Sequence, residues 1–180
     1  FEDMKAGLKK AAAKGYKVES IGVDTWGVDF GLIDRDGQLI GNPVCYRDAR
    51  TAGMVEEMFK TLNPTEHYAT TGIQVMEINT LPQLLSIKGT AQLEYAQHLL
   101  FMPDLFSYFL TGNATNEYCI ASTSELLDAK KRDWSWETIE ALGLPKHIFG
   151  EIVMPGTVRG ELRKDIAEET GLGDVTGLAV

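Results

Sequence analysis

The sequence SIGVDTWGVDF occupies residues 20–30 and carries the clearest indication of the fold. Residues 18–23 alternate between polar and apolar side chains and then become apolar, which is typical of a strand buried in a sheet. Polar Asp24 and Thr25 follow, and a second strand is predicted over residues 28–33. Because strands are followed by helical segments, the order of elements predicts an α/β layer architecture.

The segments on either side of this stretch supply the other predicted elements. Apolar residues at helical spacing predict an amphipathic helix from residue 1, which ends at Gly15. Asp36-Gly37 is a turn signal, so we expect a hairpin whose partner strand begins at residues 39–40; the strands and the hairpin fill residues 18–45. Further helices are expected over residues 54–62, 65–68 with Thr65 as the N-cap, 80–87, 103–110, 121–127, 136–142 and 164–170, and a last strand over residues 175–180.

The composition is that of an ordinary folded, globular protein, and a small molecule is the expected kind of ligand. The 180 residues include 17 Lys and Arg against 26 Asp and Glu, and the formal net charge of −9 argues against a nucleic-acid partner. No apolar stretch approaches the roughly 20 residues that span a bilayer, so no membrane partner is expected. Only Cys45 and Cys119 are present, which favours a reduced, cytoplasmic compartment. His67, His98 and His147 lack metal-ligand spacing, so no metal site is expected.

Gly27 and Trp26 are candidate ligand-binding residues. Gly27 has no Cβ, so a ligand could approach its backbone closely, and Trp26 offers a flat apolar face that packs well on sugar C–H groups. On residue types alone a structural role is favoured, in which Gly27 marks a bulge and Trp26 fills the core. Asp24 and Asp29 would face opposite sides of one strand, so they form a catalytic pair only if a turn at Gly27 resets the alternation.

A second candidate cluster is YRDAR at residues 46–50, which follows the predicted hairpin and precedes a helix. Loops in this position of an α/β fold often carry functional side chains. Arg47 or Arg50 could bind an anionic or hydroxylated ligand through its planar guanidinium. Alternatively, these arginines pair with Asp48 or with neighbouring carboxylates.

Other motifs narrow the chemistry. Tyr118 and the Ser-Thr-Ser run at residues 122–124 offer hydroxyls, for which local capping is the favoured interpretation. The sequence contains no GxxxxGK[ST] loop, no GxGxxG after a strand and no GxSxG, so no phosphate cradle or nucleophile elbow of those kinds is expected. The residues by themselves predict a small-ligand-binding α/β domain.

Six segments follow one another in a characteristic order along the whole chain. They are SIGVDTWGVDF at 20–30, PVCYRDART at 43–51, TGIQ at 71–74, NTL at 79–81, MPD at 102–104 and LTG at 110–112. Together they resemble the FGGY family of carbohydrate kinases. The PD and LTG pieces are shared broadly in that family, whereas DTWGVDF and YRDxR resemble the branch that acts on L-rhamnulose.

This resemblance implies an actin-like ATPase, ribonuclease H-like fold with a mixed sheet and flanking helices. Residues 1–180 would form an incomplete part of the N-terminal, sugar-binding domain, with no internal boundary. The implied reaction of L-rhamnose catabolism transfers the γ-phosphate of ATP, with Mg²⁺, to the 1-hydroxyl of L-rhamnulose. By the same resemblance Gly27 would contact the ketose, Trp26 and Thr25 would flank it, and residues 78–79 would lie near a second sugar-contact stretch.

The resemblance also implies parts that lie outside the chain. The phosphate loop would precede Phe1 and the general-base aspartate would follow Val180, so no catalytic, cofactor-binding or metal-binding residue is assigned here. A helix that opens without a cap at residue 1 agrees with a piece of a longer protein, which we expect to be inactive alone. Alternatives are a kinase for another ketose or deoxysugar, such as xylulose or fuculose, and a non-catalytic sugar-binding module. The oligomeric state stays open.

Overall fold

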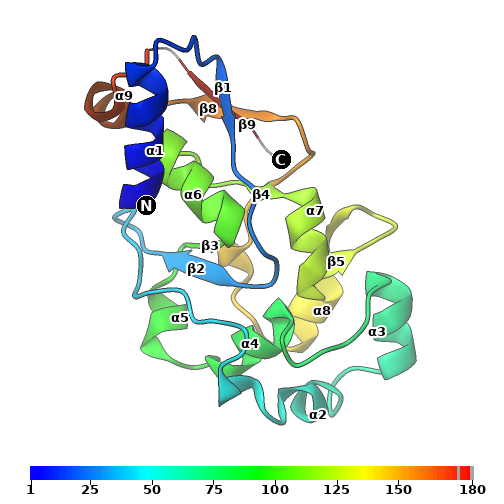
Figure 1. Cartoon of the computed structure of the whole chain (residues 1–180). Helices are drawn as coiled ribbons and strands as arrows, with labels where there is room; N and C mark the ends of the chain where they lie inside the picture. Colours follow the sequence, from blue (N-terminus) through cyan, green and yellow to red (C-terminus); the bar gives the residue numbers. More distant parts are fainter. Residues whose placement is uncertain (174, 179–180) are drawn as a thin grey trace.

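The computed structural model describes residues 1–173 and 175–178 (Figure 1). The α-helices are α1 (Glu2–Ala13), α2 (Met54–Met58), α3 (Pro64–Thr71), α4 (Thr80–Ser86), α5 (Ala91–Tyr95), α6 (Met102–Thr111), α7 (Tyr118–Ala121), α8 (Trp136–Ala141) and α9 (Lys164–Thr170). The 3₁₀ helices are η1 (Ala49–Thr51), η2 (Ser122–Ser124) and η3 (Lys146–Ile148). The strands are β1 (Ser20–Gly22), β2 (Phe30–Ile33), β3 (His98–Phe101), β4 (Asn116–Glu117), β5 (Leu127–Asp128), β6 (Asp133–Trp134), β7 (Ile152–Val153), β8 (Val158–Glu161) and β9 (Thr176–Leu178). In this part of the chain, no helix combines the length and apolar character needed to cross a lipid bilayer.

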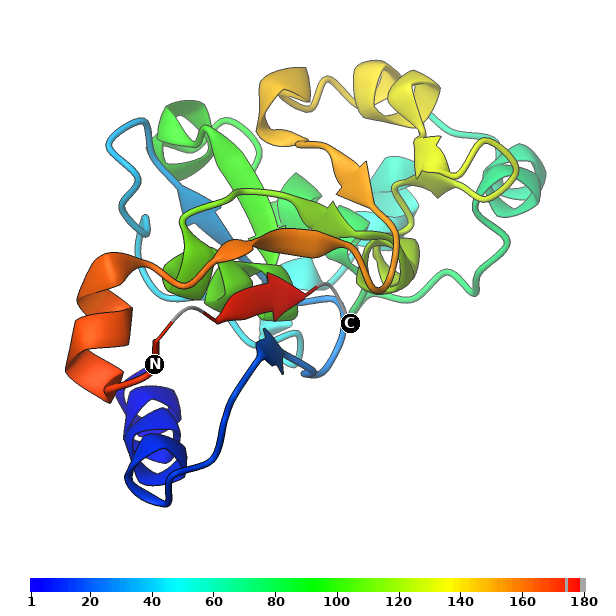
Figure 2. The ribbon, with the colours of Figure 1, turned by 90° about the horizontal axis from the view of Figure 1, so that it is seen from above.

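A mixed three-stranded sheet lies at one end of the molecule. β1 runs parallel to β9, which pairs antiparallel with β8. α1 and α9 lie side by side next to this sheet in both views (Figures 1 and 2). They share with β1 and α6 a core cluster that includes Leu110, Leu162 and Ile166. The predicted α/β class with a mixed sheet and flanking helices is therefore confirmed. β9 covers residues 176–178 of the last strand predicted at 175–180; residue 175 precedes it, and residues 179–180 lie outside the described residues.

β2 has one neighbour that the sequence predicts and one that it does not. It runs antiparallel to β3, which follows it by more than 60 residues in the chain. The predicted hairpin is present but short: the Asp34 N–H donates to the Gln38 carbonyl oxygen at 2.9 Å, and Leu39 forms an antiparallel bridge with Ile33. Gly41 adopts a φ of 69° and Pro43 has no N–H for a sheet ladder, so the extended run ends there.

Most of the predicted helices are present, but several of their ends differ. α2 stops at Met58, which is four residues before the predicted end. The prediction of Thr65 as the N-cap of α3 is wrong, because the Asn63 side chain accepts hydrogen bonds from the N–H groups of Thr65 and Glu66 at 2.9 and 3.2 Å. Pro64 then occupies the first helical position, where its missing N–H carries no penalty.

The predicted helix over residues 121–127 is also wrong. α7 and η2 together end at Ser124, and Glu125 adopts a φ of 64°. A left-handed residue cannot continue a right-handed helix. The chain therefore turns, and Leu127 begins β5, which pairs with β6.

A buried ion pair connects α6 to the three-stranded sheet. The Asp104 carboxylate accepts hydrogen bonds from the guanidinium of Arg159 on β8, from the Glu117 N–H and from the Asn116 amide. The Asp104 and Arg159 side chains are 0% and 2% exposed. Since a buried charge without its partner is costly, this pair fixes the position of α6 against the sheet.

Candidate functional site

A strained turn lies at residues 27–29. The Asp29 N–H donates to the Gly27 carbonyl oxygen at 2.9 Å, and Val28 between them has a φ of 67°. These features define the uncommon form of γ-turn, in which the central residue has a positive φ. A β-branched residue in this conformation costs on the order of 1–3 kcal/mol, so it persists only where its surroundings hold it. The alternative of a bulge at Gly27 is therefore wrong, and the second strand starts at Phe30.

Two segments distant in sequence hold the backbone of Val28. Its carbonyl oxygen accepts hydrogen bonds from Thr80 Oγ1 at 2.7 Å and from Gln83 Nε2 at 3.2 Å, both on α4. Its N–H donates to Thr123 Oγ1 in η2 at 3.3 Å. Thr80 and Gln83 are fully buried. Both polar backbone groups of the strained residue are therefore paired by side chains.

Gly27 makes room for the Thr123 side chain. A Cβ on Gly27 would lie 3.2 Å from Thr123 Oγ1, which is closer than an ordinary contact. The hydroxyls of Ser122, Thr123 and Ser124 each donate to the carbonyl oxygen three residues earlier, at 2.6 to 2.7 Å. The predicted local capping by residues 122–124 is confirmed. The contact of Thr123 with Val28 has no signal in the sequence, because the two residues are 95 positions apart.

The Trp26 ring is anchored beside the turn and open to solvent. Its indole Nε1 donates to Asp29 Oδ2 at 2.8 Å. Asp29 is 3% exposed whereas Trp26 is 53% exposed, so the alternative in which Trp26 fills the core is wrong. Thr25 Oγ1 donates to the Trp26 carbonyl oxygen at 2.9 Å. Asp24 is exposed and Asp29 is buried, so these two carboxylates lie in different environments.

An open pocket of about 460 Å³ lies beside Trp26. Its lining residues are Trp26, Asp29, Asn42, Pro43, Cys45, Tyr46 and Met102. The pocket thus brings together side chains from both clusters that the sequence singles out, whereas Gly27 and Thr25 adjoin Trp26 without lining it. An aromatic face, a carboxylate and a phenol within this volume suit a small hydroxylated ligand.

The two candidate arginines are engaged outside this pocket. The Arg47 guanidinium lies over the Tyr46 ring, with 5.1 Å from Cζ to the ring centroid. Arg50 Nη2 donates to Gln83 Oε1 at 2.8 Å, and burial lowers the pKa of the Arg50 guanidinium. Asp48 accepts from the backbone N–H of Arg50 at 2.9 Å. The alternative of an ion pair between the side chains of Arg50 and Asp48 is therefore wrong.

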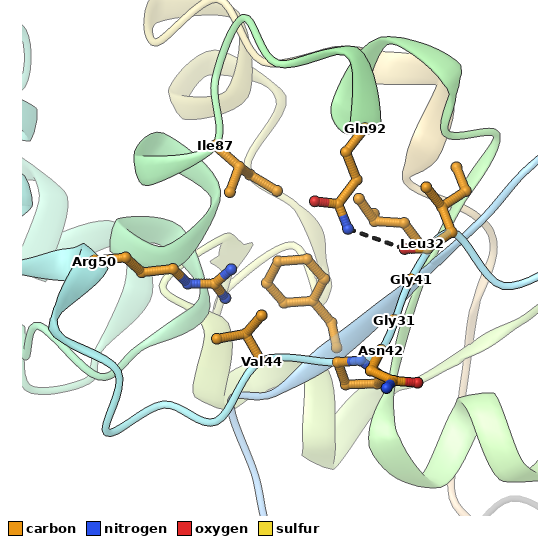
Figure 3. A pocket seen from close by; sticks show the side chains of 11 residues that line it. Gly31, Leu32, Gly41, Asn42, Val44, Arg50, Ile87 and Gln92 are labelled. Atoms are coloured by element: carbon orange, nitrogen blue, oxygen red, sulfur yellow. Dashed lines mark hydrogen bonds between the residues drawn. The ribbon is translucent and has the colours of Figure 1, made fainter.

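Arg50 also lines a second, much smaller cavity (Figure 3). This cavity has a volume of about 10 Å³ and is bordered by Ile87 and by Gln92, whose Nε2 donates to the Ile40 carbonyl oxygen at 2.9 Å. The buried Nε of Arg50 has no hydrogen-bond partner among the described residues. A volume of this size holds one water molecule, so the larger pocket is the candidate ligand site.

Residues 78–79, the second predicted sugar-contact stretch, form hydrogen bonds within the protein. The Asn79 side chain is buried, and its amide donates to Glu125 Oε1. Glu125 Oε2 in turn lies 3.1 Å from Nε2 of the buried His67. The Ile78 carbonyl oxygen accepts from Gln83 Nε2 at 2.9 Å. Neither Asn79 nor Ile78 lines the candidate pocket.

Comparison with known sequences gives consistent matches. Residues 2–178 match the N-terminal domain of the FGGY family of carbohydrate kinases. A rhamnulokinase from Bacteroides thetaiotaomicron is 44% identical over 176 residues, which are 97% of this chain and 36% of that protein. A rhamnulokinase from Oceanobacillus iheyensis is 38% identical over 174 residues, or 96% of this chain and 37% of that protein. The chain thus spans little more than a third of the length of these relatives.

Solved structures show the same fold. A carbohydrate kinase from Novosphingobium aromaticivorans superposes with a TM-score of 0.84 at 27% identity, over 98% of this chain and 37% of that chain. A ligand-bound xylulose kinase from Lactobacillus acidophilus superposes with a TM-score of 0.86 at 17% identity, over the same shares of the two chains. The second likeness shows the fold alone.

Proposed function

Because the chain belongs to the FGGY family of carbohydrate kinases, we propose that it forms the sugar-binding side of a kinase that phosphorylates L-rhamnulose at its 1-hydroxyl. The 44% identity to a rhamnulokinase over nearly the whole chain supports this choice among ketoses. Residues 1–180 would be part of the N-terminal domain of that kinase, without an internal boundary. The product would be L-rhamnulose 1-phosphate.

The anchored ring of Trp26 is the observation that carries the proposal. Its N–H is held by Asp29, so the ring stays in place while one face remains open over the pocket. We propose that the apolar C–H face and the methyl group of the ketose pack on this ring. Trp26, Gly27 and Thr25 remain the proposed substrate-binding residues, and the pocket adds the Asp29 carboxylate and the Tyr46 hydroxyl as candidate partners for sugar hydroxyls.

ATP and Mg²⁺ are the proposed phosphate donor and metal, and when bound they supply the phosphoryl group and neutralise its charge. Within the residues that the structure describes, no group of three or more His, Cys, Asp or Glu side chains is placed to hold a metal ion. We therefore assign these residues no step that involves the metal or the nucleotide. Their proposed contribution is to bind and orient the sugar, and the general base is proposed to follow Val180.

A sugar panel with the full-length protein tests the proposal. ADP release would be measured with L-rhamnulose, D-xylulose, L-fuculose and no sugar, and the highest kcat/KM is expected with L-rhamnulose. A preference for xylulose or fuculose would mean that the protein is a kinase for that sugar and not for L-rhamnulose. Binding of a sugar without ADP release for any member of the panel would favour the non-catalytic module instead.

A further inference from the structure

The side-chain amide of Gln83 on α4 forms hydrogen bonds to the turn at residues 27–29 and to Ile78. Its side chain is 0% exposed and lies beneath the Trp26–Asp29 turn. Gln83 Nε2 lies 3.2 Å from the Val28 carbonyl oxygen, 3.3 Å from Asp29 Oδ1 and 2.9 Å from the Ile78 carbonyl oxygen. All three are acceptors, so the NH₂ group has to face them.

Arg50 fixes the opposite side of the same amide. Its guanidinium carries only donors, so the atom that it meets at 2.8 Å has to be the carbonyl oxygen of Gln83. A reversed amide would set N–H groups against the guanidinium and an oxygen against three acceptors. The Gln83 side chain therefore has one orientation, which is set jointly by Arg50 and by the turn.

The two segments that Gln83 joins form different walls of the candidate pocket. The turn carries Trp26 and Asp29, while the segment that leads to Arg50 carries Cys45 and Tyr46. Thr80, one helical turn earlier on α4, adds a hydrogen bond to the same Val28 carbonyl oxygen at 2.7 Å. Hydrogen bonds from α4 thus stabilise the strained turn, and the bond between Gln83 and Arg50 connects the turn to the segment that carries Cys45 and Tyr46.

We propose that Gln83, assisted by Thr80, is a positioning residue that holds the Trp26 wall of the pocket in register with the Tyr46 wall. The proposal rests on the proposed sugar site, because positioning has a kinetic effect only if a sugar binds there. Gln83 itself touches neither the pocket nor a reacting atom. Its loss moves the ring of Trp26 and weakens sugar binding without changing nucleotide binding.

The variants Gln83→Leu, Gln83→Glu and Thr80→Val test this in the full-length protein. Thr80→Ser retains a hydroxyl for Val28 and is the conservative rescue. Ser86→Ala is the matched control, because the Ser86 hydroxyl bonds only to the Gln83 carbonyl oxygen within α4, at 2.6 Å. The sugar KM is expected to rise about tenfold in the first three variants, as for loss of a hydrogen bond to a positioned group. The ATP KM should stay constant throughout.

A second measurement needs no substrate. Fluorine NMR of protein labelled with 5-fluorotryptophan, in which a Trp26→Phe variant assigns the Trp26 signal, reports the environment of that ring. The Trp26 signal should shift or broaden in Thr80→Val and in the Gln83 variants, and should match the wild type in Thr80→Ser and Ser86→Ala. This measurement tests whether Gln83 and Thr80 position the ring even if no sugar in the panel is a substrate. The absence of a substrate would count against the proposed function alone.

An unmoved Trp26 signal in a folded Gln83 variant would overturn the proposal. A shifted signal with an unchanged KM for a sugar that the wild type phosphorylates would also overturn it. If both Gln83 variants fail to fold, Thr80→Val decides the outcome by the same two measurements.

Discussion

The indole N–H of Trp26 donates to the carboxylate of Asp29 at 2.8 Å, across a turn whose central residue has a φ of 67°. The acceptor is buried and the donor ring is half exposed, so the hydrogen bond joins the interior to the wall of an open pocket. A ring held at its polar edge loses little conformational freedom when a ligand packs on its face.

The first prediction concerns this ring. Trp26→Ala should raise the KM for L-rhamnulose at least tenfold, since it removes the apolar face on which the sugar is proposed to pack. Trp26→Phe should lie between the wild type and Trp26→Ala. Trp136→Ala is the control, because Trp136 is 38% exposed on α8 and does not line the pocket. Steady-state kinetics of the full-length protein measure all three, and equal KM values for Trp26→Ala and Trp136→Ala would contradict the placement of the sugar.

The second prediction uses the two cysteines as reporters. Both are free and exposed, but only Cys45 lines the pocket. L-rhamnulose should slow the alkylation of Cys45 by N-ethylmaleimide and leave Cys119 unaffected. Partial desolvation, with a contribution from nearby Glu117, raises the pKa of the Cys119 thiol, so Cys119 should react more slowly at neutral pH than a thiol of ordinary pKa. Mass spectrometry of the labelled peptides gives both rates, and protection of neither or both cysteines would argue against a sugar in this pocket.

The third prediction concerns the stability of the α6–β8 contact. Arg159→Met leaves the buried Asp104 without its partner and should cost about 3–5 kcal/mol. Arg163→Met removes an exposed pair with Asp165 at 2.8 Å and should cost much less, because solvent screens the pair. Thermal unfolding of the two variants measures the difference. Similar midpoints for both would mean that the buried pair does not hold the fold together.

The fourth prediction is a pH dependence at the contact between α1 and α9. Lys5 and Lys9 each donate to the Glu169 carboxylate at 2.9 Å, and these hydrogen bonds hold the pKa of Glu169 below its ordinary value of 4.5. A lowered pKa in the folded state stabilises the protein above that ordinary value, and the contribution is lost as the pH falls through the folded pKa. The midpoint difference between wild type and Glu169→Gln should therefore be present at pH 7 and shrink as the pH falls below 4.5. High salt should reduce it at pH 7, because the pair is exposed to solvent. A difference that grows in acid would refute this account.

The fifth prediction separates sugar binding from catalysis. The 180-residue chain by itself should release no ADP with L-rhamnulose, because the proposed phosphate loop and general base lie outside it. The full-length protein under the same conditions is the positive control. Turnover by the 180 residues would mean that a base and a nucleotide site exist within them.

The parts of the fold that the sequence predicts well are those with local signals. α6 begins with Pro103 in its first turn and ends at Gly112, whose φ is 82°, so both ends are marked by residues whose backbone preferences are strong. α9 matches its predicted bounds for a similar reason, since Gly171 follows with a φ of 72°. Trp26 stands out by residue type and by its place after a strand, and it lines the pocket. In the second cluster the sequence analysis favours Arg47 and Arg50, but Tyr46 lines the pocket instead.

The parts that the sequence does not predict depend on distant pairs. The local turn signal at Gly37 places Leu39 opposite Ile33, but no local signal indicates that β3, more than 60 residues later, also pairs with β2. The γ-turn at Val28 contradicts the preference of a β-branched residue, and its supports on α4 and η2 lie 52 to 95 residues away. Nothing in the sequence distinguishes Gln83 from other glutamines. Its role follows only from the three acceptors and one donor that surround its amide in the folded protein. Local strain of this kind is visible only with the tertiary contacts that stabilise it.

The pairing of β1 with β9 has a consequence for the order in which the chain is made. Ser20 lies opposite Thr176, so β9, the partner of β1 among the described residues, is made only after the ribosome has added more than 150 further residues. At about 5–20 residues per second, this interval is on the order of ten seconds or more. β1 therefore leaves the ribosome well before β9, whereas the interval between β2 and β3 is less than half as long. Chaperone binding at residues 20–22 of the nascent chain should accordingly end once β9 has emerged.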